Sequence, residues 1–134
     1  MENAAVSLFA LMTRFVRSVA VAGGAELREF GLSPAQYQVL VCLETEPGLA
    51  QRELVRRFGV TKGNISQLVK KLEDSGLVER TRAGRTAGLV LSGSGRELVG
   101  RVTPAHDDFM DRHFRALDAT ERRQLEALLT RLTA

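Results

Sequence analysis

The chain has 134 residues, of which 44% are hydrophobic and 26% are charged. This length suffices for one globular domain with a modest core and excludes a large multidomain enzyme. The formal net charge is only +3, which is too small for a polycationic tail. The charges are nevertheless concentrated, because residues 51–85 contain nine basic and four acidic side chains. A basic middle between near-neutral ends predicts a localised site for an anionic polymer.

The N-terminal segment is apolar enough to be compared with a signal peptide or a membrane span. No basic residue precedes the apolar run of residues 4–22, and Arg14 and Arg17 interrupt it. These charges argue against both a cleaved leader and a bilayer-spanning helix. The single cysteine, Cys42, allows no internal disulfide, which fits a reducing compartment. We therefore expect a cytoplasmic protein that does not bind a membrane.

Hydrophobic periodicity predicts the first two elements. Apolar side chains recur at three- and four-residue steps through residues 4–22, which indicates a helix with a broad apolar face. We expect Gly23 and Gly24 to end this helix. A second helix over about residues 34–46 begins with a serine N-cap and a proline at its first position.

Two short helices follow, over residues 51–58 and 62–75, and Gly59 lies in the turn between them. Thr61 is the expected N-cap of the second helix, whose apolar side chains recur at i, i+3, i+4 and i+7 before Gly76 closes it. Two short helices joined by a glycine-containing turn predict a helix-turn-helix.

Beyond the helix-turn-helix the hydrophobic period changes to two. Residues 77–82 and 88–91 predict two short strands. The glycine-rich stretch at residues 83–87 is the expected tip between them. The pattern therefore predicts a β-hairpin, or wing.

The C-terminal part is predicted to be helical. Ser92 is the expected cap of a long helix that Pro104 should bend. A last helix begins with Asp118 as N-cap and Glu121 as its capping-box partner. The expected fold is mainly α-helical with a small β-hairpin wing, in one domain of residues 1–134. Its winged helix-turn-helix covers about residues 32–92, and its dimerisation helices cover residues 1–24 and 93–134.

A helix-turn-helix reads duplex DNA by laying its second helix in the major groove. Opposite the apolar stripe of that helix lie the short polar and basic side chains that this readout needs. They are Thr61, Lys62, Gly63, Asn64, Ser66, Gln67, Lys70 and Lys71. Asn64 and Gln67 suit the edge of adenine, whereas Ser66 and Thr61 suit a base or a phosphate. The competing interpretation is an ordinary amphipathic helix with a solvated polar face.

Arginines flank this helix on both sides. They are Arg80, Arg82 and Arg85 in the wing and Arg52, Arg56 and Arg57 in the preceding helix. A narrow minor groove attracts inserted arginine, which suits the wing set. The other set is predicted to clamp phosphates, which governs affinity rather than sequence choice. Solvated surface charge is the alternative for both sets.

Four ordered segments carry a resemblance to a known family. They are LSPAQYQVL (residues 32–40), EPGLAQREL (46–54), VTKGNIS (60–66) and LEDSGLVER (72–80), and LSGSGR (91–96) follows them. In this order they resemble the MarR family of bacterial winged-helix regulators. The resemblance implies a homodimer with intertwined terminal helices, winged domains that grip a pseudo-palindrome, and often a small ligand between the two parts.

The wing departs from the family pattern. Many members carry Asp-x-Arg there, and the acid braces an arginine for insertion into the minor groove. Aligned on residues 89–91, this chain has Gly84 at the acid position and Thr86 at the arginine position, in a shorter wing. Either Arg85 or Arg82 takes over the contact, and the sequence leaves the choice open.

The terminal helices indicate a dimer independently of the family, because a small helix-turn-helix core cannot cover all their apolar faces. An intramolecular bundle is the alternative. The expected interface residues are Val6, Phe9, Met12, Phe109, Phe114, Leu125, Leu128 and Leu132. Phe15, Phe30 and Tyr37 are candidates to line a pocket for a small aromatic or phenolic effector, although a core contains such residues as well.

Three further residues are candidates for sensing a ligand, an oxidant or a metal ion. Cys42 lies in an apolar helical stretch and is predicted to be a small buried hydrophobe rather than a redox sensor. His106 and His113 share a helix face two turns apart, too far to bind one ion unaided. They are predicted to be polar surface or interface residues, and we expect no metal or other cofactor.

The sequence thus predicts a dimeric, sequence-specific DNA-binding transcriptional regulator, most simply a repressor that a small molecule releases from a pseudo-palindromic operator. A winged-helix module that binds a protein is the alternative, and its binding would depend less on salt. An enzyme is not expected, because the sequence has no triad spacing, phosphate loop, paired carboxylates or metal cluster.

Overall fold

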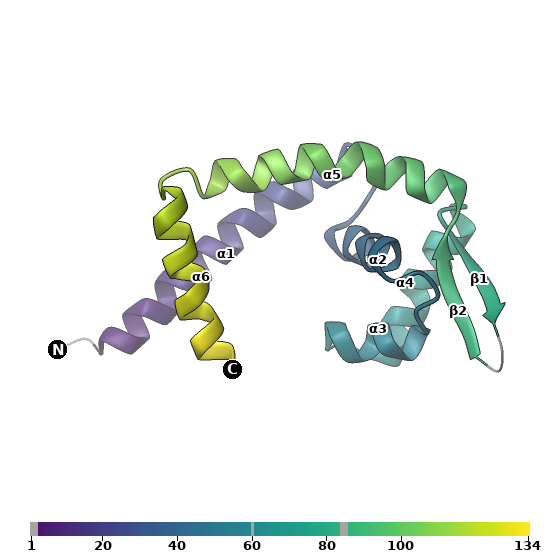
Figure 1. The fold of residues 1–134 in the computed structure, drawn as a ribbon, viewed down its shortest axis with the longest axis horizontal. Coiled ribbons are helices and arrows are strands. Elements are labelled where there is room, and N and C mark those ends of the chain that lie inside the picture. The colour runs from purple at the N-terminus through teal and green to yellow at the C-terminus, as the bar shows by residue number, and fades with distance from the viewer. Residues whose placement is uncertain (1–2, 60, 84–85) are drawn as a thin grey trace.

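The computed structural model describes residues 3–59, 61–83 and 86–134. The elements in chain order are α1 (Ala4–Arg28), α2 (Pro34–Thr45), α3 (Gln51–Phe58), α4 (Lys62–Asp74), β1 (Val78–Ala83), β2 (Thr86–Leu91), α5 (Gly93–His113) and α6 (Ala119–Thr133). Figure 1 shows α2, α3, α4 and the hairpin gathered at one end of α5, whereas α1 and α6 lie toward the other end. The predicted mainly helical winged fold is confirmed.

The predicted helix starts are confirmed because their signals are local. Ser33 accepts a hydrogen bond from the Gln36 backbone N–H at 3.1 Å, and the Gln36 side chain accepts one from the Ser33 backbone at 2.8 Å. Asp118 and Glu121 form the same reciprocal pair, at 2.9 Å each. Ser92 accepts from the backbone of the third residue of α5 at 3.0 Å. Each cap satisfies N–H groups that a helix start leaves without partners.

The prediction that α1 ends at Gly23 and Gly24 is wrong, because the helix continues to Arg28. At Gly23 the helix α1 packs directly on α5, and a Cβ there would lie 3.4 Å from the Phe109 ring, in van der Waals contact. Leu27 is 2% exposed and joins the core one turn later. This packing outweighs the low helix propensity of glycine, which costs about 1 kcal/mol relative to alanine.

The two wing strands are antiparallel; β1 has its predicted length but lies one residue later, and β2 begins two residues earlier than predicted. Their register runs from Val78 opposite Leu91 to Ala83 opposite Thr86, so the expected tip at residues 83–87 was too long. Backbone pairing needs no apolar side chain, and it therefore extends past the residues that the sequence pattern marks. Leu49 pairs with Leu89 on the outer edge of β2. This bridge anchors the wing to the segment that precedes α3.

One hydrophobic core holds the winged part together. It lies between α2, α3, α4, the hairpin and the first half of α5, with one contribution from α1. Its fully buried members are Leu27, Val39, Leu40, Leu43, Leu54, Ile65, Val69, Leu72, Leu89, Val99 and Val102. The helix α5 continues through Pro104 and arches over the molecule (Figure 1). The first half of α5 belongs to the core of the winged part, and its second half continues toward α6.

Candidate nucleic-acid interface

Helix α4 has one buried and one exposed face. Ile65, Val69 and Leu72 are 1%, 0% and 0% exposed and attach the helix to the core. All eight positions predicted for DNA contact, from Thr61 to Lys71, are exposed. The geometry required of a groove-reading helix is therefore present, with its apolar stripe anchored and its polar side chains available.

The N-terminal end of α4 is capped but open to approach. The Thr61 hydroxyl accepts a hydrogen bond from the Asn64 backbone N–H at 3.2 Å, so this oxygen already serves the helix. A Cβ at Gly63 would meet none of the described atoms within 4 Å. Gly63 therefore does not pack against this protomer, and its open side faces outward.

A polar network joins α4 to α3 and the wing. The Gln51 amide donates to Ser66 Oγ at 2.8 Å and accepts from Arg80 Nη2 at 3.0 Å. Arg80 also donates to Glu73 Oε1, at 3.1 Å from Nε and 3.0 Å from Nη2. We predicted Arg80 as a wing contact to DNA, but its guanidinium is held at the base of the wing. Sequence reasoning missed Gln51 and Glu73, because their partners lie far along the chain.

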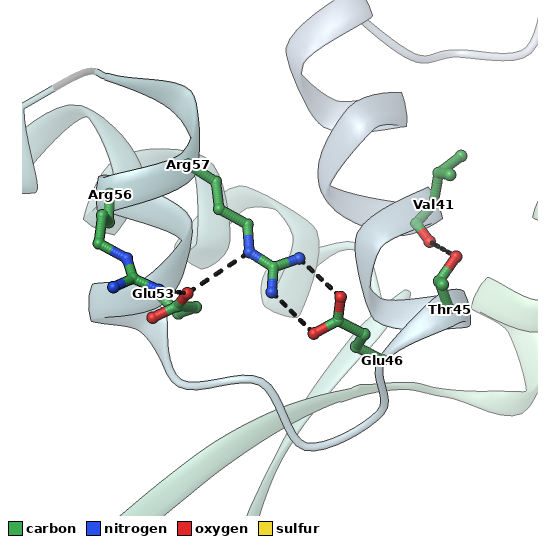
Figure 2. A network of polar contacts seen from close by, with 6 residues as sticks. All are labelled: Val41, Thr45, Glu46, Glu53, Arg56 and Arg57. Carbon is green, nitrogen blue, oxygen red and sulfur yellow. Dashed lines mark hydrogen bonds and ion pairs between the residues drawn. The ribbon is translucent and has the colours of Figure 1, made fainter. Parts of the chain in front are cut away.

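The arginines at the end of α3 are also engaged within the protein, as Figure 2 shows. Arg57 donates two hydrogen bonds to the Glu46 carboxylate, both at 2.8 Å, and lies 3.6 Å from Glu53. Arg56 pairs with Glu53 as well. The predicted phosphate-clamp role of Arg56 and Arg57 must therefore compete with these ion pairs. The three- and four-residue spacing from Glu53 could have predicted two of these pairs.

These contacts shift the pKa values of the acidic partners. The hydrogen bond from Arg57 lowers the pKa of the Glu46 carboxyl below its ordinary value, and the hydrogen bond from Arg56 does the same for Glu53. The pKa of Arg57 is raised, chiefly by its hydrogen bond to Glu46. All these groups therefore remain charged at neutral pH, and the loop before α3 is held to its last turn.

The remaining predicted arginines differ in their surroundings. Arg52 and Arg82 are exposed, and within the described part of the chain neither has a carboxylate within 4 Å. They are the basic side chains of these two sets with the fewest competing contacts. Arg85 lies outside the described residues.

The terminal helices expose large apolar side chains. Among the predicted interface residues, Phe9 is 71%, Leu128 54% and Leu132 74% exposed. Val6 and Met12 are exposed too, whereas Phe114 and Leu125 are half-buried. Phe109 is an exception and corrects the prediction, because it is 7% exposed and packs on Gly23 and His106 within the protomer. An apolar groove of about 490 Å³ runs between α1 and α6, lined by Leu8, Met12, Leu125, Leu128, Leu129, Arg131 and Leu132.

The three residues predicted to line an effector pocket do not share one. Phe15 packs edge-on against Phe114, with ring centroids 5.0 Å apart, and Phe30 packs against the core. Tyr37 instead lines a cavity of about 240 Å³ together with Val19, Ala20, Gly23, Gly24, Leu27, Pro34, Gln38, His106, Phe109 and Met110. Its hydroxyl lies 2.9 Å from Thr103 Oγ1, and burial raises the pKa of this phenol.

Helix α1 alone has the length and hydropathy of a membrane span among the described residues. Its apolar window has a mean hydropathy of 1.5, and none of that window is buried. Arg14 and Arg17 are exposed on this helix. The exposed apolar face of α1 therefore needs a partner. The composition of α1 does not identify that partner, so the other elements of the fold must be used to infer it.

Helices α3 and α4 form a helix-turn-helix, the β-hairpin forms its wing, and long terminal helices flank both. This arrangement defines a winged helix-turn-helix protein, and comparisons with known proteins agree. The sequence model of the MarR family matches residues 30–87. An uncharacterised HTH-type transcriptional regulator of Bacillus cereus is 31% identical over 79% of this chain and 73% of its own length. The HTH-type transcriptional repressor Mb2911 of Mycobacterium bovis is 31% identical over 81% of this chain and 80% of its own.

Solved structures give the same result. The chain is similar to the Mycobacterium tuberculosis MarR family protein Rv2887 in its complex with DNA, with a TM-score of 0.79 and 28% identity over 95% of this chain and 98% of that one. This chain belongs to the MarR family of transcriptional regulators.

Proposed function

We propose that this chain is a dimeric repressor of transcription that binds a pseudo-palindromic operator through α4 of each protomer. The observation that carries the proposal is the exposed polar face of α4, anchored on its opposite side by fully buried aliphatic residues. The DNA complex of the M. tuberculosis relative and the repressor from M. bovis support it. Such a protein acts where the DNA is, which supports a cytoplasmic location.

Distinct residues carry affinity and sequence choice. Asn64 and Gln67 present amides suited to an adenine edge, and both are exposed. Arg52 is proposed to contact a phosphate, and Arg82, exposed on β1, is proposed to enter the minor groove. Three exposed lysines of α4 are also proposed to contact phosphates or the groove. They are Lys62, Lys70 and Lys71.

The proposed dimer covers the terminal helices. A second copy is the occupant that fits the apolar face of α1 and the groove against α6, because twofold symmetry supplies the same apolar surface in return. The winged part, about residues 32–92, then lies outside the dimer core. Two recognition helices one DNA turn apart, about 34 Å, would meet an inverted repeat.

A small effector is proposed for the cavity lined by Tyr37 and Phe109. Its volume of about 240 Å³ and its mainly apolar walls suit a small aromatic molecule. The cavity lies between α1, α2 and α5, so it contacts both the dimerisation helices and the winged part. A ligand that binds better when the winged parts are splayed would shift the population away from the DNA-bound state.

The test is selection of duplexes from a random pool with the purified full-length protein, followed by sequencing. An enriched inverted repeat, with binding that weakens steeply as salt rises, would support the proposal. A flat salt dependence and no enriched sequence would contradict it and favour a protein partner instead.

A further inference from the structure

The side chain of Gln51 links the recognition helix α4 to the wing through two hydrogen bonds. Gln51 is the first residue of α3, yet its side chain touches Ser66 on α4 and Arg80 on β1. Arg80 is in turn fixed by two contacts to Glu73 near the end of α4. Four side chains from three elements thus form one hydrogen-bonded chain beside the exposed face of α4.

The direction of this chain follows from the chemistry of arginine. A guanidinium has only donors, so the group of Gln51 that faces Arg80 must be the carbonyl oxygen, Oε1. The amide nitrogen then faces Ser66 and donates to Oγ at 2.8 Å. Arg80 cannot turn away freely, because Glu73 accepts from it on the other side.

Within the described residues the Ser66 hydroxyl makes one hydrogen bond, as acceptor from Gln51, and its own hydrogen has no acceptor in the chain. Helical Thr13, Thr45 and Thr130 donate their hydroxyl hydrogens to the carbonyl oxygen four residues earlier, at 2.9, 3.1 and 2.8 Å. Ser66 instead receives a hydrogen bond from Gln51, so its own hydrogen cannot point at that donor. A donor that lies at the end of a hydrogen-bonded chain is polarised and strengthened.

We propose that Gln51 is a positioning residue for DNA reading, because it holds the Ser66 hydroxyl as a donor that selects a hydrogen-bond acceptor on a base edge. Serine by itself can donate or accept and therefore discriminates poorly. Gln51 occupies one of the two lone pairs of the Ser66 oxygen, which leaves the hydroxyl hydrogen and a single lone pair for DNA. The balance therefore shifts toward acceptors such as a purine N7 and away from the amino group of cytosine. The inference rests on the proposed function, since it needs α4 in the major groove.

The informative variant is Gln51→Glu. Its carboxylate still accepts from Arg80, and a negative charge in the first turn of α3 favours the helix, so the thermal unfolding midpoint should not fall. It has no donor, however, so Ser66 would turn its hydrogen toward residue 51 and away from DNA. The added negative charge weakens binding to every duplex by the same factor. This factor therefore cancels in the ratio of the nonspecific dissociation constant to the operator dissociation constant.

The experiment measures that ratio for the full-length wild type, Ser66→Ala, Gln51→Glu and the double variant, on the operator obtained by selection. We expect each single variant to lower discrimination about 5- to 100-fold, the value of one good base contact. The double variant should lose no more than Ser66→Ala alone, because both changes remove the same contact.

Three results would overturn the inference while leaving the proposed function intact. They are unchanged discrimination in Ser66→Ala, unchanged discrimination in Gln51→Glu, and a double variant that loses the product of the two single effects. If the wild type selects no sequence at all, the proposed function fails and this inference fails with it.

Discussion

The winged part and the terminal helices solve the same packing problem in different ways. Helices α2, α3 and α4 each bury their apolar residues against one another and the wing. By contrast, no residue of α6, which is described throughout, is buried, and α1 buries only Gly23 and Leu27. An amphipathic pattern therefore predicts that a face will be covered, but it does not say whether the same chain covers it.

The difference also separates stability from assembly. The buried leucines of the winged part contribute to the folding of one chain, whereas Leu128, Leu129 and Leu132 of α6 are 36% to 74% exposed. Substitutions in the two regions should consequently have different readouts, and the following predictions run from the largest expected effect to the smallest.

Leu128→Glu should convert the proposed dimer into a monomer and weaken operator binding by about 100-fold or more, because two linked half-sites become independent. Leu128 is 54% exposed and lines the groove against α1. Light scattering gives the oligomeric state, and titration with operator DNA gives the affinity. Thr120→Glu in the exposed first turn of α6 is the control. A Leu128→Glu protein that remains dimeric with full affinity would show that a second copy does not cover this face.

Leu54→Ala should lower the free energy of unfolding by about 2–5 kcal/mol, because it leaves a cavity where the side chain is 0% exposed. Urea titration followed by circular dichroism measures the change. Leu54→Met, which roughly conserves volume, should cost less than about 1.5 kcal/mol. Equal and small losses in both variants would mean that the winged core is loosely packed.

Gln67→Ala and Arg52→Ala should separate base reading from phosphate binding. The first should cost about 1–3 kcal/mol of discrimination at particular operator positions, whereas the second should weaken all duplexes alike and reduce the salt slope by about one. Binding to an operator series at several salt concentrations measures both. Identical behaviour of the two variants would invalidate the groove assignment of α4.

Glu46→Gln should flatten the loss of stability in acid. The ion pair with Arg57 lowers the folded-state pKa of Glu46 below 4.5, so its stabilisation is present above that value and is lost as the pH falls through the folded-state pKa. The effect should be the smallest of the four, since both side chains are accessible to solvent. Thermal unfolding from about pH 6 to pH 3 measures it.

Glu44→Gln, another exposed carboxylate of the same region, is the matched control for that acid titration. It should retain the acid dependence of the wild type. If Glu46→Gln and the wild type lose stability in parallel, the ion pair between Glu46 and the last turn of α3 contributes nothing to folding.

Much of the fold could be predicted from short stretches of sequence. The starts of α2, α4, α5 and α6 depend on a capping residue and its partner three positions later, so each signal lies within one turn. The exposed and buried faces of α4 likewise follow from a 3.6-residue period. These local rules also identified the side chains proposed to read DNA.

Other features required the tertiary structure. Arg57 and Glu46 are eleven residues apart, and Arg80 and Gln51 are twenty-nine apart, so no local spacing predicts either contact. The packing of α1 on α5, where Gly23 meets Phe109, likewise joins residues that lie far apart in the sequence, and it buries Phe109 within the protomer. The sequence also could not separate Tyr37, which lines a cavity, from Phe30, which packs on the core, because aromatic side chains occur in both places.

The order of the helices, their caps and the polar face of the recognition helix were thus determined by the sequence itself, because helix geometry relates residues only three or four positions apart. Which arginines are free and which are engaged was decided only when α2, α3, α4 and the wing came together. The reason is electrostatic, since an arginine binds whichever carboxylate the folded chain places within reach.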